Sequence, residues 1–269
     1  MKDNSAKSVA RAAKNSTTLR VLARLGFATN GLLHILIGGI AISVAIGAGG
    51  GSADQSGALK QLASTPGGVF VLWAVVIGMF ALGIWLIIAA FLILGGDPKK
   101  KWARRVAEVS KGVVYLVLAF TAFTFANGGS SSSSGSASDA AGTLISSPGG
   151  VILLFIGGVA ILAIGIYFIR KGVATKFTED IVVPPEPARK MVMVLGIAGY
   201  VSKGIALGVV GVLVGVAAIT HDPSKSTGLD GGLKTLAELP FGVVILCVVG
   251  AGLIAYGVYC FVRAQRARF

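Results

Sequence analysis

Apolar residues run through this chain in six long, nearly uncharged stretches, and polar residues are confined to the segments between them. Each stretch is close to or above the roughly 20 residues that a helix needs to cross a hydrocarbon core. Uninterrupted apolar segments satisfy their backbone polar groups inside a membrane only as helices. The pattern therefore predicts an all-α integral membrane protein with six transmembrane helices, at about residues 25–48, 69–94, 106–126, 151–169, 192–219 and 241–262.

Composition agrees with this prediction and excludes a water-soluble domain. Of the 269 residues, 54% are hydrophobic and 13% are charged, whereas a soluble domain carries about 25% charged residues. The mean hydropathy is +0.84. The chain has too few charged side chains to cover the surface of a globular core.

The basic residues are concentrated on one side of the predicted membrane. Of the 24 lysines and arginines, only Lys60, Lys225 and Lys234 fall on the other side. Because cytoplasmic segments of membrane proteins carry the excess of basic residues, both termini are expected in the cytoplasm. The net charge of +13 then predicts contact with anionic membrane lipids on the cytoplasmic face. No nucleic acid is expected as a partner, because the basic residues border membrane spans and lack interleaved aromatic residues.

The chain repeats one two-helix pattern three times. An early glycine marks each odd-numbered span, a proline precedes each even-numbered span, and a second glycine follows that proline by 17 residues. In repeat order these residues are Gly31, Gly112 and Gly204; Pro66, Pro148 and Pro240; and Gly83, Gly165 and Gly257. The spacing predicts three tandem helical hairpins with pseudo-threefold symmetry. Their expected bounds are a basic N-terminal segment at 1–24, repeats at 25–97, 98–174 and 189–269, and a proline-containing cytoplasmic linker at 175–188.

Small residues recur within the spans at steps of seven, which keeps them on nearly the same helix face. Such residues allow membrane helices to approach closely. We therefore expect a structural packing role for the early and late glycines of each repeat and for Gly38, Gly208 and Gly211.

The connecting segments support more local predictions. The three prolines are expected in the first turn of the even-numbered helices, where a missing N–H is tolerated. Short interfacial helices are expected at 58–63 and 233–237, whereas the serine-rich segment 130–138 should be flexible. The linker at 175–188 is expected to be an extended cytoplasmic strap.

This layout of glycines and Pro-Gly pairs resembles the bacterial family catalogued as domain of unknown function number 1206. The resemblance covers about residues 20–264. It implies a multi-pass protein of the bacterial plasma membrane built from three tandem two-helix repeats. It implies no activity, cofactor or functional residue.

Polar residues at equivalent positions of the repeats are the candidate ligand-binding or lipid-binding residues. Asn30, Lys111 and Lys203 each precede the early glycine of an odd-numbered span, and His34 and Tyr115 share a second equivalent position. If the hairpins surround a threefold axis, Asn30 and the two lysines form one ring that attracts an anion, since charges inside a membrane often mark functional sites. The alternative is that each lysine extends to the headgroups, with Glu108 pairing Lys111.

The sequence offers no catalytic constellation. Its two histidines, His34 and His221, are predicted near opposite membrane faces, so a histidine-rich metal centre is not expected. Serines occur without a nearby histidine base. We therefore expect no catalytic residues, metal or cofactor, and a non-enzymatic structural or accessory role that engages lipids or a membrane-protein partner. The alternative is a small-solute or ion transporter or channel, because internal repeats are common in transporters.

Overall fold

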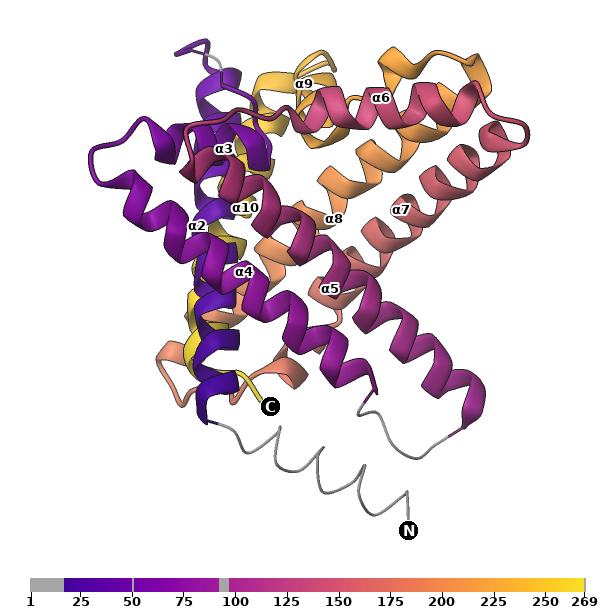
Figure 1. Cartoon of the computed structure of the whole chain (residues 1–269). Helices are drawn as coiled ribbons and strands as arrows, with labels where there is room; N and C mark the ends of the chain where they lie inside the picture. The colour runs from indigo at the N-terminus through magenta and orange to yellow at the C-terminus, as the bar shows by residue number, and fades with distance from the viewer. Residues whose placement is uncertain (1–16, 50, 92–96, 269) are drawn as a thin grey trace. The chain divides into compact units, whose positions relative to one another are not determined.

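The computed structural model describes residues 17–49, 51–91 and 97–268, which form helices with no strand among them (Figure 1). Within these ranges, six helices are long and apolar enough to cross a membrane, which confirms the predicted fold class. They are α2 (Thr17–Ala45), α4 (Gly68–Phe91), α5 (Pro98–Ala126), α7 (Gly150–Val173), α8 (Ala188–Thr220) and α10 (Gly242–Arg266). Residues 1–16 of the predicted basic segment and residues 92–96 at the end of the first repeat lie outside the described residues.

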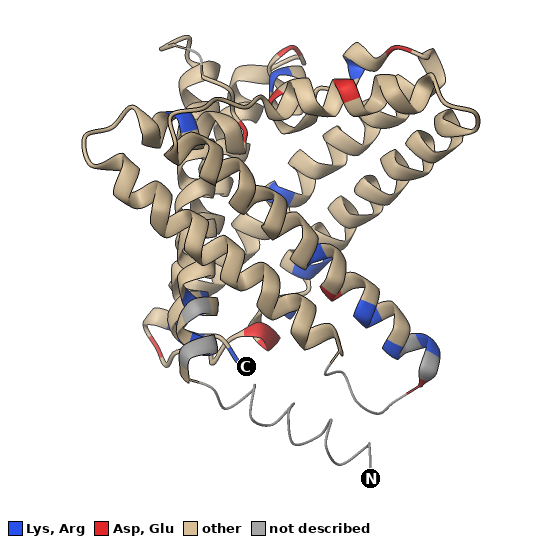
Figure 2. Ribbon diagram, in the orientation of Figure 1, with Lys and Arg blue, Asp and Glu red and all other residues tan. Residues whose placement is uncertain are grey.

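Basic side chains occupy the helix ends that the sequence predicts to be cytoplasmic. Figure 2 shows lysines and arginines in the first turns of α5, where its sequence begins PKKKWARR. Arg170 and Lys171 lie in the last turn of α7, and Arg263 and Arg266 lie in the last turn of α10. Cations at a helix C-terminus also interact favourably with the helix dipole.

A short helix precedes each even-numbered span. These helices are α3 (Gln55–Ala63), α6 (Ser133–Ile145) and α9 (Gly228–Ala237). The helices expected at 58–63 and 233–237 are confirmed, but the expectation of a flexible serine segment was wrong. Ser132 caps the N-terminus of α6 by accepting a hydrogen bond from the Gly135 N–H at 3.0 Å. Serine is a favoured N-cap residue, so here it starts a helix.

The expected position of the prolines was also wrong, because each lies in a turn before its helix. In the second repeat Gly150 N–H donates to the Ser147 carbonyl at 3.0 Å, and Gly149 has φ 75° and ψ −2°. These values define a type II turn, with proline at the second position and glycine at the third. The first repeat has the same turn with Gly67 at φ 76°, and the third has Phe241 at φ 61°.

The last residue of each turn is a glycine for a steric reason. A Cβ on Gly68 would overlap the carbonyl oxygen of Leu62, and one on Gly150 would overlap that of Leu144. Gly242 stands in the same relation to Ala237. The spanning helix therefore starts directly against the last turn of the short helix, and only glycine fits there.

The repeats are joined by contacts between the even-numbered span of one repeat and the odd-numbered span of the next. A Cβ on Gly83 of α4 would lie 2.9 Å from the carbonyl oxygen of Gly112 on α5. A Cβ on Gly257 of α10 would lie 2.5 Å from the carbonyl oxygen of Gly31 on α2. Gly165 of α7 meets α8 in the same way. We call these three contacts the α4–α5, α7–α8 and α10–α2 seams.

Two of the seams continue seven residues further along the helices. A Cβ on Gly158 would lie 2.9 Å from the Gly211 carbonyl oxygen in the α7–α8 seam, and one on Gly38 would lie 2.5 Å from that of Gly250 in the α10–α2 seam. The equivalent residues of the α4–α5 seam are Val76 and Ala119. The backbone contact of the α4–α5 seam is therefore limited to a single glycine pair.

A second set of glycines, which was not predicted from the sequence, joins the two helices of one repeat. A Cβ on Gly26 of α2 would lie 2.8 Å from the Gly78 carbonyl oxygen of α4, and one on Gly199 of α8 would lie 2.6 Å from Cα of Tyr256 on α10. The signal is a glycine five residues before the early glycine of the repeat. In the second repeat that position is Ala107.

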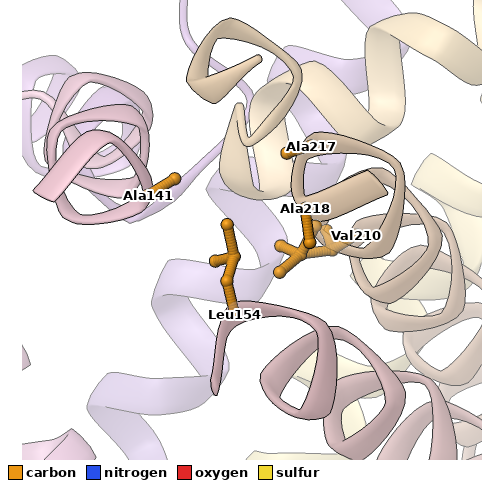
Figure 3. Packing of buried hydrophobic residues seen from close by; sticks show 6 residues of the cluster. Ala141, Leu154, Val210, Ala217 and Ala218 are labelled. Atoms are coloured by element: carbon orange, nitrogen blue, oxygen red, sulfur yellow. The ribbon is translucent and has the colours of Figure 1, made fainter. Parts of the chain in front are cut away.

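By their internal contacts the described residues divide into two compact units. One comprises residues up to Asn30, Leu62–Ser130 and the end of the chain from Cys260, and the other comprises Gly31–Gln61 and Ser131–Tyr259. The core of the second unit includes a cluster in which Leu154 of α7 packs among small residues of its neighbours (Figure 3). The other cluster members are Ala141, Val210, Val214, Ala217 and Ala218.

Candidate functional site

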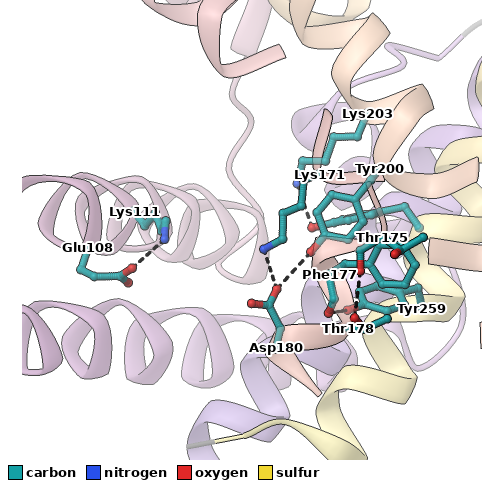
Figure 4. A network of polar contacts seen from close by, with 11 residues as sticks. Glu108, Lys111, Lys171, Thr175, Phe177, Thr178, Asp180, Tyr200, Lys203 and Tyr259 are labelled. Carbon is teal, nitrogen blue, oxygen red and sulfur yellow. Dashed lines mark hydrogen bonds and ion pairs between the residues drawn. The ribbon is translucent and has the colours of Figure 1, made fainter. Parts of the chain in front are cut away.

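The segment between α7 and α8 folds back onto the helices through one phenylalanine. A 3₁₀ helix, η1 (Lys176–Asp180), places Phe177 at 0% exposure (Figure 4). The Phe177 ring stacks on Tyr200 with centroids 5.6 Å apart and meets Tyr259 edge-on at 5.3 Å. Gly196 of α8 makes room, because a Cβ there would overlap the phenylalanine ring. The part of the linker at η1 is therefore a packed turn and not the extended strap that the sequence predicts.

Polar contacts hold η1 in place beside the ring cluster. The Tyr259 hydroxyl donates to the Phe177 carbonyl at 3.0 Å. Lys171 forms an ion pair with Asp180 at 2.7 Å, and the Tyr200 hydroxyl lies 3.5 Å from the same carboxylate (Figure 4). Since charge-assisted hydrogen bonds are stronger than neutral ones, Asp180 ties this segment to α7.

Lys203 lies midway along α8 among aromatic rings. It comes 15 residues after the start of the helix at Ala188, which is roughly 22 Å along the axis. Its ammonium group donates to the Tyr256 hydroxyl at 3.2 Å and lies 4.3 Å from that ring centroid and 5.2 Å from that of Phe168. Cation–π contacts stabilise an ammonium that has lost part of its water.

The two positions equivalent to Lys203 have different partners. Lys111 is exposed and forms the ion pair with Glu108, three residues before it, at 2.7 Å. Asn30 is 6% exposed, and its amide donates to the thiol sulfur of Cys260 at 3.5 Å. Asn30 and Lys111 belong to one unit and Lys203 to the other. The three side chains share a register in the repeats but not an environment.

The second pair of equivalent residues also diverges. His34 is 9% exposed and its ring centroid lies 4.7 Å from that of Tyr256. Tyr115 is partly buried. The ring contact links His34 to Lys203, because both touch Tyr256. The shared contact of His34 and Lys203 with Tyr256 was not predicted from the sequence, since it depends on how α2 and α8 pack against α10.

A shallow groove runs along the basic end of α7. Its volume is about 680 Å³, within the range of 300–1,000 Å³ typical of ligand sites. The wall is apolar toward the middle of the helix and basic toward its C-terminus. Its residues include Ile166, Tyr167, Arg170, Lys171, Val173 and Lys176.

The three repeats coincide with three matches to one family model. The family described as "Domain of Unknown Function (DUF1206)" matches residues 25–92, 107–175 and 198–267. The chain belongs to this family. It is also 30% identical, over 249 residues, to "Uncharacterized protein YxxB" of Bacillus subtilis (strain 168), with 89% of this chain and 88% of that protein covered. No solved structure matches the chain.

The second DUF1206 match ends at residue 175 and the third begins at residue 198, so all of η1 lies between them. Phe177 and Asp180 thus lie between the second and third matched segments. The signal in the sequence was Phe177, the one aromatic residue of the linker at 175–188.

On the side opposite the basic helix ends, the short helices of this DUF1206 chain share a buried polar cluster. Asp54 is 1% exposed and accepts a hydrogen bond from the Gly57 N–H at 2.9 Å, capping α3. Asp230 of α9 accepts one from the Ala53 N–H at 2.7 Å and pairs with Lys234 at 2.8 Å. Burial raises the pKa of the Asp54 carboxyl, and the nearby Asp230 carboxylate raises it further, against the lowering effect of the Gly57 N–H.

Serine hydroxyls complete the contacts among α3, α6 and α9. The Ser56 and Ser133 hydroxyls lie 2.5 Å apart, and Ser133 N–H donates to the Ser56 hydroxyl at 2.9 Å. The Ser138 hydroxyl donates to the Pro223 carbonyl, just ahead of α9, at 3.0 Å. Within the described residues, no group of three or more histidine, cysteine or acidic side chains is arranged to hold a metal ion.

Proposed function

We propose that this protein is a non-enzymatic component of the bacterial plasma membrane that binds anionic lipid on its cytoplasmic side. The observation that carries the proposal is a set of exposed cations where two apolar spans end. Arg170 lies at the end of α7, Lys176 follows it, and Arg189 and Lys190 lie in the first turn of α8. Basic residues at this depth interact with anionic headgroups at about 1 kcal/mol each.

The surroundings of these cations favour lipid over a contact within the protein. Among the residues that the structure describes, no carboxylate lies within ion-pair distance of Arg170 or Lys176. Tyr167, one turn before Arg170, is 57% exposed. Tyrosine is enriched at membrane–water interfaces, so this arrangement supports a headgroup level near Arg170.

Lipid selectivity in vesicles tests the proposal. The full chain is reconstituted in phosphatidylcholine vesicles with a trace of spin-labelled phosphatidylglycerol or spin-labelled phosphatidylcholine. We expect a larger motionally restricted fraction for the phosphatidylglycerol label at low salt, and a smaller difference at high salt because surface charges are screened. Equal fractions for the two labels at low salt would refute the proposal.

Solute transport is the second candidate function, and Lys203 is the observation that favours it. A lysine midway along a spanning helix marks a functional position by default, and its contact with Tyr256 adds a second titratable group beside it. The test is the permeability of proteoliposomes to small anions and protons. A flux that the wild-type chain supports and Lys203→Met abolishes would establish transport in place of the accessory role.

A further inference from the structure

We propose that the groove along the basic end of α7 is a binding site for one anionic phospholipid, with its phosphate between Arg170 and Lys176. The inference rests on the proposed function and names the place and the ligand. The groove extends from residues inside the α7 span, which ends at Val173, to Lys176 beyond it. It therefore crosses from the depth of acyl chains to the depth of headgroups.

The spacing of residues on α7 makes the groove a single two-part surface. Tyr167, Arg170 and Lys171 are three and four residues apart and lie on one helix face. Ile166, nearer the middle of the span, is 51% exposed, and Val173 is 67% exposed. The same face thus offers an apolar wall to an acyl chain and cations to a headgroup.

The charges in the groove are not equivalent. Lys171 is neutralised by Asp180 at 2.7 Å and its side chain is only 14% exposed. Arg170 and Lys176 are exposed and have no carboxylate partner within the described ranges. An arginine guanidinium can donate two parallel hydrogen bonds to one phosphate, whereas a lysine acts as a point charge. Two available cations are enough to neutralise the single negative charge of one phosphodiester, as in phosphatidylglycerol or one half of a diphosphatidyl lipid.

The packed η1 turn fixes the position of the second cation. Lys176 is the first residue of η1, and its neighbour Phe177 is fully buried against Tyr200 and Tyr259. The backbone at Lys176 is therefore held beside the end of α7. A site whose backbone is already ordered loses less conformational entropy when a ligand binds.

The ligand is a lipid and not a soluble anion, because most of the groove wall is apolar. Val173, Ile166 and Tyr167 would contact nothing on a bound inorganic phosphate. A phospholipid satisfies both parts of the groove at once. The chemistry that the site recognises is a phosphate monoanion joined to acyl chains.

Native mass spectrometry of the full chain in detergent tests the site. The measured quantity is the dissociation constant of the first bound phosphatidylglycerol or phosphatidylcholine, for the wild type and for the double variant Arg170→Gln/Lys176→Gln. At about 1 kcal/mol per cation, each removed cation costs about fivefold in affinity. We expect the double variant to bind phosphatidylglycerol about 25-fold more weakly and to bind phosphatidylcholine as the wild type does.

The matched control is a double variant that removes two positive charges from α5 instead of from the groove. Lys99 and Arg104 are exposed in the first turns of α5, and Lys99→Gln/Arg104→Gln should change phosphatidylglycerol affinity less than twofold. Thermal unfolding checks that both double variants remain folded. Glycerol phosphate, which lacks acyl chains, should not displace the lipid.

Three results would overturn the site. These are an equal loss of affinity in the two double variants, no loss in either, or displacement of the lipid by glycerol phosphate at concentrations similar to those of phosphatidylglycerol. In each case a wild-type preference for phosphatidylglycerol over phosphatidylcholine would leave the proposed function standing. The absence of that preference in the wild type would refute the proposed function itself.

Discussion

Gly165 of α7 and Gly204 of α8 touch through their backbones alone. A Cβ on Gly165 would lie 2.7 Å from the Gly204 carbonyl oxygen, and one on Gly204 would lie 2.6 Å from that of Gly165. The relation is reciprocal in the α4–α5 seam as well, where a Cβ on Gly112 would lie 2.8 Å from the Gly83 carbonyl oxygen. Close backbone approach of this kind is what small residues contribute to helix packing in membranes.

Two neighbouring glycines of α7 should respond oppositely to substitution by alanine. A Cβ on Gly158 would lie 2.7 Å from the backbone nitrogen of Gly215, whereas a Cβ on Gly157 meets nothing within 4 Å. We expect Gly158→Ala to lower the free energy of unfolding by about 1–3 kcal/mol. Gly157→Ala should raise it by up to about 1 kcal/mol through helix propensity. Unfolding in mixed micelles followed by circular dichroism measures both, and equal stabilities would mean that the α7–α8 seam is looser than described.

The third-repeat turn should gain stability from a glycine. Phe241 occupies the left-handed position at φ 61° that Gly67 and Gly149 occupy in the other repeats. A bulky residue in this conformation costs about 1–3 kcal/mol, and Phe241 is 84% exposed. Phe241→Gly should therefore raise the melting temperature, and Gly149→Ala, at the equivalent position, should lower it. A lower melting temperature for Phe241→Gly would show that the phenylalanine ring contributes more than its backbone costs.

Removal of the Phe177 ring should release the η1 turn from the helices against which it packs. Phe177→Ala deletes a fully buried side chain, and such deletions cost about 3–5 kcal/mol. Limited proteolysis measures the release: the Lys176 side chain is already exposed, but the packed turn holds its backbone, and trypsin should cleave after it faster when the turn opens. Val182→Ala is the matched control, since Val182 is 52% exposed in the same linker. Equal cleavage rates for the two variants would contradict the anchoring role of Phe177.

The cluster of short helices should become less stable as the pH rises through the mildly acidic range. Because burial raises the pKa of Asp54 above 3.8, the folded chain binds this proton more tightly than the unfolded chain does. The stabilisation is complete below the ordinary pKa of the carboxyl and is lost as the pH rises through the raised, folded-state pKa. Asp54→Asn keeps the side chain uncharged, so the stability difference between the wild type and Asp54→Asn should change across this range. Hydrogen exchange of the α3 amides measures this stability difference. Parallel pH profiles for the wild type and Asp54→Asn would contradict the prediction.

The predicted orientation of the helices rests on the distribution of basic residues and can be tested by labelling. A membrane-impermeant thiol reagent applied to intact cells should modify Lys60→Cys and Lys225→Cys, which lie on the side with few cations. It should not modify Arg189→Cys or Arg266→Cys until the cells are lysed. Cys247→Ser/Cys260→Ser serves as the background, because the chain has two native cysteines. The reverse labelling pattern would invert the topology and move the α7 groove to the outer face.

The sequence predicts the helices of this protein better than its connections, and the reason is physical. Hydrophobic length determines the spans directly, so all six were found within a few residues. The three prolines before the even-numbered spans were predicted inside the helices because proline suits both a first helical turn and the second position of a type II turn. The hydrogen bond from the Gly150 N–H to the Ser147 carbonyl, which the structure shows, distinguishes the turn from a first helical turn.

The candidate site was harder to predict, because it depends on contacts between distant residues. Phe177 reaches Tyr259 across 82 positions of the chain, and no local pattern predicts that pairing. The equivalence of Lys111 and Lys203 in the repeats was visible in the sequence. The ion pair between Lys111 and Glu108 was also predicted, because the two residues are three positions apart on one helix, and the structure confirms it. The contact between Lys203 and Tyr256 was not predicted, since Tyr256 approaches from another helix.

The seams make each repeat depend on its neighbours for packing. Each seam pairs the even-numbered helix of one hairpin with the odd-numbered helix of the next, and the last hairpin returns to the first through Gly257 and Gly31. One hairpin therefore carries both halves of a heterologous, head-to-tail interface and cannot satisfy either half by itself. Removal of the third repeat would therefore leave both Gly31 and Gly165 without the glycine that each one contacts, at opposite ends of the remaining chain of hairpins.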